Sequence, residues 1–176
     1  MIPRVKVRVI KRTSRVPLSL AQAFQFFSNP HSVVMLTPSV MQFRLVGNAS
    51  ETIKPGTVLD YRFRFYRIPL RWRVRIDSVE APNSFEDAQE KGPFGHWRHT
   101  QMFLAQGETT TEIRDRFEFG LPFGRVGEFV YRMFVKTMLR QMFDYRADKI
   151  DLLMHHATQQ FAGARTNPTP TSAPQV

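Results

Sequence analysis

The order of the predicted elements limits the fold of this chain more than any other feature. Between residues 40 and 119, apolar and polar residues alternate in short runs, the period-2 pattern of half-buried strands. From about residue 126 to residue 156 no residue breaks a helix, and a helix of that length spans roughly 45 Å. A sheet that is apolar on one face must be covered, and this is the only predicted element long enough to cover it. The sequence therefore predicts an antiparallel sheet packed against one long C-terminal helix.

Turn signals and caps divide the rest of the chain. Residues 4–12 alternate apolar and basic side chains and predict a first strand. Ser19 can cap a short helix that stops near Asn29 and Pro30, and residues 31–36 form a second helical turn. Six further strands follow, and their short turns pair neighbours antiparallel. The turn signals are Gly47-Asn48, Pro55-Gly56, Ile68-Pro69, Ala81-Pro82-Asn83, Gly92-Pro93 and Gly107-Glu108.

The predicted C-terminal helix carries an apolar stripe at three- and four-residue steps, which predicts the face that packs on the sheet. A curved sheet wrapped around one helix leaves a space between them, and apolar ligands bind in such spaces. The fold class is therefore α+β, with seven strands, two short helices after the first strand and a hollow under the last helix. The stripe comprises Val126, Val130, Met133, Phe134, Met138, Met142, Tyr145, Leu152 and Leu153.

Composition narrows the class of protein. The chain has no cysteine, which excludes disulfides, thiolate zinc sites and cysteine nucleophiles. No continuous apolar stretch follows the basic N-terminus, and no window approaches the roughly 20 apolar residues that span a bilayer. We therefore expect no signal peptide and a soluble, cytoplasmic protein. We expect one domain over residues 1–157 and a disordered Pro/Thr-rich tail over residues 158–176.

The formal net charge is +10, and arginines gather on one predicted sheet face. Tyr61, Phe63 and Trp72 alternate with these arginines, so the other face of the same strands is apolar. The basic face is a solvated surface, a docking surface for an anionic membrane or acidic partner, or a nucleic-acid site. The last is least favoured, because a nucleic-acid binder interleaves exposed aromatic residues with its basic ones. The face comprises Arg62, Arg64, Arg71, Arg73 and Arg75, with Arg4, Lys6 and Arg8 as an extension.

A few polar residues are predicted to face inward among apolar ones. Asp87 and His99 lie on two strands joined at Gly92-Pro93, so their side chains can meet across the ladder. Asp115 alternates with apolar neighbours and needs a partner when buried, for which Arg146 on the long helix is available. These residues either orient the polar group of a ligand or form a structural network that holds the helix on the sheet. Both interpretations remain open at this point.

The second half of the chain carries a recognisable pattern, which consists of FEDAQEKGPFGHWRH at residues 85–99, then Phe103, Asp115, Pro122 and Tyr145-Arg146. The pattern resembles the ligand-binding SRPBCC proteins of the START-like superfamily, which also includes polyketide cyclases and lipid-transfer domains. This resemblance covers roughly residues 5–155. It implies a helix-grip fold, in which a seven-stranded antiparallel sheet grips a C-terminal helix around a cavity for hydrophobic molecules, but no single reaction. In the family pattern a second histidine often stands two places after the one that corresponds to His99. Here that place is Gln101, which weakens the case for a metal or acid/base site built from two histidines.

We expect the chain to bind a small, largely apolar molecule, such as a lipid, polyketide or isoprenoid. One alternative is a cyclase- or dehydratase-type enzyme in which His99 pairs with Asp87 or Asp115 as general acid and base. Another is an electrostatic docking module for an anionic membrane or acidic partner. No metal or cofactor is expected, and the oligomeric state stays open. The expected ligand-binding residues are Tyr61, Phe63, Trp72, Phe85, Asp87, Gln89, Trp97, His99, Gln101, Asp115, Phe117, Met138, Met142, Tyr145 and Arg146.

Overall fold

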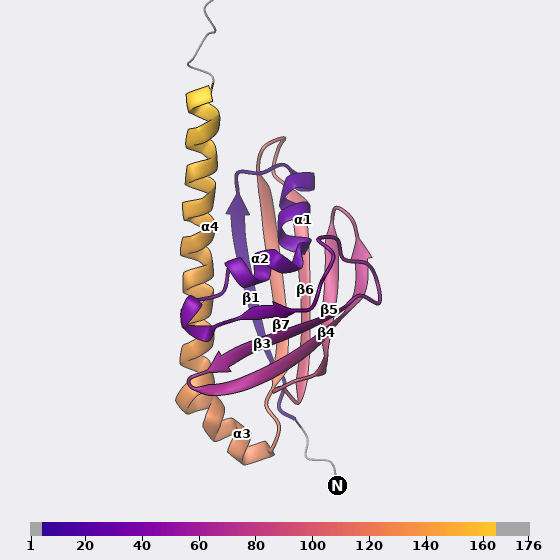
Figure 1. The fold of residues 1–176 in the computed structure, drawn as a ribbon, viewed down its shortest axis with the longest axis vertical. Coiled ribbons are helices and arrows are strands. Elements are labelled where there is room, and N and C mark those ends of the chain that lie inside the picture. The colour runs from indigo at the N-terminus through magenta and orange to yellow at the C-terminus, as the bar shows by residue number, and fades with distance from the viewer. Residues whose placement is uncertain (1–4, 165–176) are drawn as a thin grey trace, which may run out of the picture.

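Within residues 5–164, which the computed structural model describes, the chain forms one seven-stranded antiparallel sheet and a long C-terminal helix (Figure 1). The strand order is β1-β7-β6-β5-β4-β3-β2. The predicted fold class is thereby confirmed, including the two short helices after the first strand. The strands are β1 Arg8–Val16, β2 Arg44–Val46, β3 Val58–Phe65, β4 Ile68–Glu80, β5 Ser84–Lys91, β6 His96–Ala105 and β7 Thr111–Gly120. The helices are α1 Leu20–Ser28, α2 Pro30–Met35, the 3₁₀ turn η1 Ser39–Met41, α3 Gly124–Val130, the π-helical turn η2 Tyr131–Val135 and α4 Lys136–Ala164.

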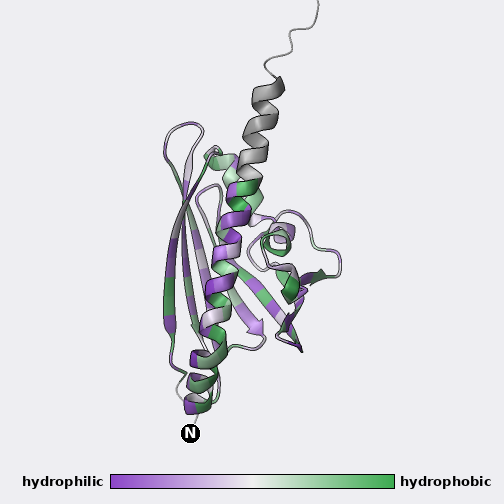
Figure 2. Cartoon of the chain, turned by 90° about the vertical axis from the view of Figure 1, so that its left-hand side faces the viewer, coloured by the Kyte–Doolittle hydropathy of each residue, from purple (hydrophilic) through white to green (hydrophobic). Residues whose placement is uncertain are grey.

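The sheet curves around α4, and the side view shows strands on both sides of this helix (Figure 2). Hydrophobic and hydrophilic residues alternate along the strands, as a sheet with one buried face requires (Figure 2). The inner side chains form two clusters. One includes Phe27 of α1 and Phe103 of β6, and the other includes Phe117 of β7 and Leu139 of α4. The first cluster lies under α1 and also contains Ile150 of α4, whereas the second packs on the first half of α4.

Side-chain caps fix the two short helices. The hydroxyl of Ser19 accepts a hydrogen bond from the Gln22 backbone N–H, and Gln22 Oε1 accepts one from the Ser19 backbone N–H. Asn29 Oδ1 accepts a bond of 2.9 Å from the backbone N–H of His31, and Pro30 occupies the first turn of α2. Such caps satisfy backbone donors that a helix start leaves free. They set where α1 ends and α2 begins, so α2 can close one end of the space inside the sheet.

The first strand differs from the prediction, because it spans Arg8–Val16 rather than residues 4–12. Its pairing with β7 sets Arg12 opposite Asp115, so its even-numbered residues face α4, and Val9 is exposed. The alternation of residues 4–12 fits either face, since a shift of one residue reverses the faces of a strand. The pairing with β7 determines which face of β1 points inward, and the alternation in the sequence does not specify that face.

Arg8 consequently lies on the inner face and does not extend the arginine-rich face. Its guanidinium group forms an ion pair with Glu128 and lies 3.8 Å from the centre of the Tyr131 ring. An arginine on this face is tolerated because a carboxylate pairs with its charge and an aromatic ring covers its plane.

The turn between β3 and β4 also differs from the prediction. It lies at Tyr66-Arg67, not at Ile68-Pro69, and Tyr66 adopts a left-handed conformation with φ of 55°. Pro69 instead sits in β4 opposite Arg64. The β4 pairing with β5 begins only at Arg73, so Pro69 occupies a stretch of strand with a neighbour on one side, where proline is tolerated.

The predicted long helix is interrupted near its start by η2, and α3 bends away from α4 (Figure 1). A π-helical turn holds an extra residue, so the face of the helix shifts after it. The buried residues of η2 and of the described side chains of α4 are Val135, Leu139, Phe143 and Ile150. Of the predicted stripe, the residues that prove to be exposed are Val126, Met133, Phe134 and Leu152. Those that are partly buried are Val130, Met138, Met142 and Tyr145, while Leu153 lies outside the described side chains.

At its other end, α4 continues to Ala164, beyond the expected helix end at residue 156. Residues 158–164, assigned from the sequence to the tail, therefore extend the helix. Alanine and glutamine recur in this segment and favour helix, and the first proline after it is Pro168. The rest of the predicted tail, residues 165–176, lies outside the described residues.

Candidate ligand-binding site

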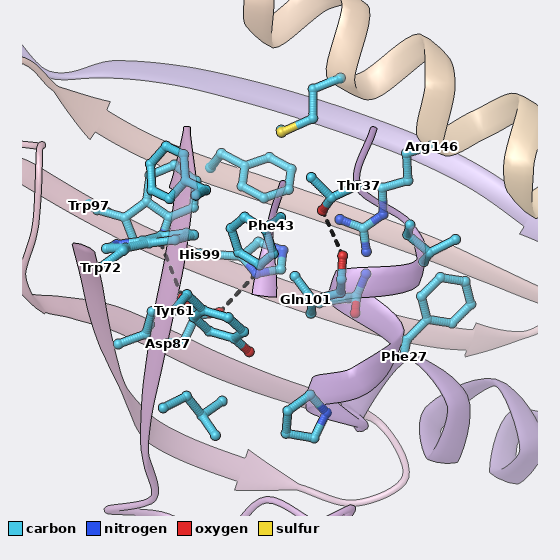
Figure 3. Close-up of a pocket in the computed structure, with 18 of the residues that line it drawn as sticks. Phe27, Thr37, Phe43, Tyr61, Trp72, Asp87, Trp97, His99, Gln101 and Arg146 are labelled. Atoms are coloured by element: carbon cyan, nitrogen blue, oxygen red, sulfur yellow. Dashed lines mark hydrogen bonds and ion pairs between the residues drawn. The ribbon is translucent and has the colours of Figure 1, made fainter. Parts of the chain in front are cut away.

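The space between the sheet and α4 contains a cavity of about 140 Å³ (Figure 3). Apolar and aromatic side chains of β3, β4, β6, α2 and α4 make up most of its wall. Two aromatic rings, Trp72 and Trp97, meet edge to face with centres 4.9 Å apart, and Phe94 packs on Trp97 at 5.0 Å. A short row of polar side chains, Asp87, His99 and Gln101, forms one side of the cavity.

His99 lies between two carboxylates. Its Nδ1 is 2.9 Å from Asp87 Oδ2, and its Nε2 is 2.9 Å from Asp115 Oδ1. Strand pairing explains this arrangement, because Asp87 is directly opposite His99 on β5 and β6, and Gln101 is directly opposite Asp115 on β6 and β7. Trp97 Nε1 donates to Asp87 Oδ1 at 3.2 Å, and Gln101 Nε2 donates to Asp115 Oδ1 at 2.7 Å. Each carboxylate therefore has two donors.

The two carboxylates keep His99 positively charged. Burial alone would lower the pKa of His99, but the charges and hydrogen bonds of Asp87 and Asp115 raise it to about 9. Burial would also raise the pKa of Asp115, but the bond with His99 and the charge of Arg146 hold this pKa below its usual value. The imidazolium ring stacks on Phe117 with centres 4.2 Å apart. At neutral pH both ring nitrogens thus carry protons that the carboxylates accept.

Gln101 leaves a hydrogen-bond acceptor free beside the cavity. Its side chain is 1% exposed and lines the cavity, and its Oε1 has no hydrogen-bond partner among the described residues. The direction of the amide is fixed, because Asp115 as a carboxylate only accepts and so selects the NH₂ group of Gln101. A buried polar atom without a partner is costly, so a free acceptor on a residue that lines a cavity is a candidate partner for a ligand donor.

Three residues that line the cavity also carry hydrogen-bond donors. The buried Nε1 of Trp72 has no partner in the described part of the chain. Burial and the nearby charge of Asp87 raise the pKa of the Tyr61 hydroxyl well above its usual value, so Tyr61 stays protonated. The guanidinium group of Arg146 reaches the cavity from α4 (Figure 3). The wall thus combines one free acceptor with several donors.

Most of the residues predicted to bind a ligand line this cavity, and three do not. Gln89 does not line the cavity, and its side chain binds the backbone of Phe94. Its NH₂ group donates to the Phe94 carbonyl, and its oxygen accepts from the Phe94 N–H. Asp115 supports His99 and Gln101 from behind the wall, and Tyr145 lies outside the lining. Those that line the cavity are Tyr61, Phe63, Trp72, Phe85, Asp87, Trp97, His99, Gln101, Phe117, Met138, Met142 and Arg146.

Other lining residues were not predicted. Leu59, Val74 and Ile76 alternate with Tyr61 and Trp72 on the same strand faces, so the period-2 pattern contained the signal for them. The residues from α1, α2 and the loops depend on how those segments fold over the sheet, which no local pattern specifies. They are Phe27, Ser28, Asn29, Pro30, Val33, Leu36, Thr37, Met41, Phe43 and Ile53, with Phe94 from the β5–β6 turn and Leu139 from α4.

Comparison with solved structures places this architecture among known folds. The ZhuI aromatase/cyclase from Streptomyces sp. R1128 aligns with a TM-score of 0.63 and 12% identity, over 82% of this chain and 92% of that one. A START superfamily protein from Mycobacterium smegmatis aligns with a TM-score of 0.62 and 8% identity, over 85% and 98% of the two chains. The chain has the START-like fold. Norcoclaurine synthase from Thalictrum flavum, in complex with dopamine and hydroxybenzaldehyde, aligns with a TM-score of 0.59 and 18% identity, over 86% and 89%.

The sequence comparisons add no closer relative to these START-like neighbours. No protein-family model matches the chain, and no curated protein sequence matches it. At identities this low, the likeness establishes the fold alone.

The described residues show neither a metal-binding group nor a membrane-spanning helix. They contain no group of three or more His, Asp or Glu side chains placed to hold a metal ion, and no helix among them is long and apolar enough to cross a bilayer.

Proposed function

We propose that the chain binds one small, largely apolar molecule that carries a hydroxyl group, in the cavity between its sheet and α4. The observation that carries this proposal is the free acceptor of Gln101, which is buried and lies beside an otherwise mostly apolar wall. A ligand hydroxyl can donate to Gln101 Oε1 and accept from Tyr61 or Arg146. The apolar body of the ligand then packs against the aromatic residues opposite.

The size of the cavity supports a ligand of about one ring. An apolar protein cavity of about 150 Å³ admits a benzene molecule, and the cavity in this chain measures about 140 Å³. The norcoclaurine synthase structure with the same fold holds dopamine and hydroxybenzaldehyde. Both are single-ring molecules with hydroxyl groups. A molecule of this size and chemistry suits a cavity of about 140 Å³ that is lined by Gln101 with its free acceptor.

The alternative of an enzyme that uses His99 as general base has weaker support. A general base needs a free lone pair near neutral pH, and both ring nitrogens of His99 instead point at carboxylate oxygens. The raised pKa of His99 further opposes loss of a proton. The same geometry suits binding, because an imidazolium ring held by Asp87 and Asp115 gives the wall a fixed shape.

The proposal is tested by titrating the protein with two matched probes, 4-methylphenol and 1,4-dimethylbenzene, and measuring heat of binding. We expect both to bind and the phenol to bind about tenfold more tightly, which is the gain from one buried hydrogen bond. Val33→Trp, which fills the cavity from α2, is expected to abolish both. Val46→Trp makes the same change at an exposed site outside the cavity and serves as the control. Binding of neither probe, or equal binding by Val33→Trp, would overturn the proposal.

A further inference from the structure

A group of large apolar side chains is exposed where the β3–β4 hairpin meets α3. We call this group the α3 end, and it comprises Tyr66, Ile68, Phe123, Val126 and Phe134, with exposed fractions of 63, 60, 74, 64 and 41%. Single exposed apolar residues are common on protein surfaces, but a contiguous group of this kind marks an interaction site. The α3 end is therefore a candidate contact surface.

Contacts between the hairpin and the helical segment show that the α3 end is one continuous surface. The rings of Tyr66 and Phe134 meet edge to face with centres 5.7 Å apart. Ile68, Phe123 and Val126 line a second cavity of about 400 Å³, whose wall is made almost wholly of apolar side chains. Phe123 adopts a left-handed conformation with φ of 69°, which a residue with a bulky side chain rarely does. The chain thus holds an exposed phenylalanine in a strained position beside an apolar hollow.

This second cavity borders the ligand cavity. Three side chains, Phe63, Phe94 and Met138, line both of them. They form the partition between the two cavities. The apolar hollow at the α3 end therefore shares a wall with the ligand cavity.

Positive charge surrounds the α3 end. Arg64, Arg67 and Arg125 are exposed, and within the described residues none of them forms an ion pair. The nearby carboxylate Glu128 is already occupied by Arg8 and Arg132. Unpaired arginines next to exposed apolar side chains match a partner that is itself anionic at its surface and apolar beneath it.

The outer face of the neighbouring strands adds to this charge. Strand pairing sets Arg44 opposite Arg62, and Arg62 opposite Arg71, so three exposed arginines lie in one row across β2, β3 and β4. Like charges directly opposite each other destabilise a sheet, and among the described residues no acidic side chain pairs with this row. An anionic partner would relieve this repulsion.

We propose that the α3 end docks on the surface of an anionic phospholipid bilayer, with its apolar side chains among the lipids and the arginines at the headgroups. A second copy of this chain is the less suitable occupant, because a two-fold contact would set these arginines against each other. The border with the ligand cavity also favours a bilayer, since apolar molecules gather there. That last argument rests on the proposed function, whereas the argument from charge does not.

Vesicle flotation tests the docking proposal. We expect the protein to float with vesicles of phosphatidylcholine and phosphatidylglycerol, to stay behind with phosphatidylcholine alone, and to be released by high salt. Tyr66→Ser/Phe123→Ser is expected to lower the partition coefficient at least tenfold, while Val40→Ser, at an exposed residue of η1, leaves it unchanged. Both variants change exposed residues, and circular dichroism checks that they fold.

Charge reversal separates the role of the arginines from folding. Arg67→Glu is expected to lower the partition coefficient about tenfold, because each basic residue near an anionic surface contributes binding energy. Lys54→Glu makes the same change in net charge before the other end of β3 and is expected to have little effect. Val33→Trp should still float, which keeps this test independent of the proposed ligand. Equal loss in Arg67→Glu and Lys54→Glu, absence of flotation, or a dimer that Phe123→Ser dissociates would overturn the proposal.

Discussion

The side-chain amide of Gln101 donates to Asp115 over 2.7 Å, while the carbonyl oxygen of the same amide has no hydrogen-bond partner among the described residues. Asp87 and Asp115 both bind His99, so these polar groups satisfy one another. Gln101 lines the cavity beside Asp87 and His99, and its carbonyl oxygen is the acceptor that this network leaves over. The first prediction follows from this difference between the hydrogen-bonded His99 network and the free oxygen of Gln101.

Replacing Gln101 with leucine should remove the preference for a hydroxylated ligand. Gln101→Leu keeps the size of the side chain but has no acceptor, so the roughly tenfold preference for 4-methylphenol over 1,4-dimethylbenzene should fall to about one. The ratio of the two affinities, measured by calorimetry, cancels changes that affect both ligands equally. An unchanged ratio would show that the hydroxyl group binds elsewhere.

The protonation of His99 gives a second prediction. Because its pKa is raised to about 9, nitrogen NMR should show both ring nitrogens protonated at pH 7 and a midpoint near 9. A group whose folded pKa is raised stabilises the fold fully below its unfolded pKa, and this contribution is lost as the pH rises through the folded value. The unfolding free energy should therefore fall between about pH 6.5 and pH 9, by on the order of 1.4 kcal/mol per unit of pKa shift. A ring that titrates near 6.5 would contradict this account.

Removal of the charge at Asp115 gives a third prediction. Asp115→Asn takes away one carboxylate that holds the buried imidazolium, so it should lower both the pKa of His99 and the unfolding free energy, the latter by roughly 3 kcal/mol. Asp60→Asn makes the same chemical change at a partly exposed ion pair with Arg73 and should cost less than about 1 kcal/mol. Urea unfolding of the two variants gives the comparison. Equal losses would mean that the His99 network adds no special stability.

The sequence predicts the fold well because its main signals are local. Alternation along β3, β4 and β6, the cap at Ser19 and the unbroken helical segment each specify an element, and the elements admit few arrangements. The same alternation places Asp87, His99 and Asp115 inward, and strand pairing then brings them together. This part of the site follows from period and turn length alone.

The remaining features depend on contacts between distant segments. The face of β1 follows from its pairing with β7, since the alternation of basic and apolar residues fits either face. The inner face of α4 follows from η2, because an extra residue in one turn shifts every later side chain. The closure of the cavity by Val33 and Thr37 follows from how α2 folds over the sheet. None of these has a signal within a single stretch of sequence.

Native mass spectrometry of gently purified protein, compared with the same protein after denaturation, tests whether the cavity holds a ligand. We expect an added mass on the folded protein that disappears on denaturation and is recovered in an organic extract as a small hydroxylated molecule. We expect no added mass on Val33→Trp and the full added mass on Val46→Trp. A folded protein that carries no added mass and takes up neither matched probe would show that the cavity is not a binding site.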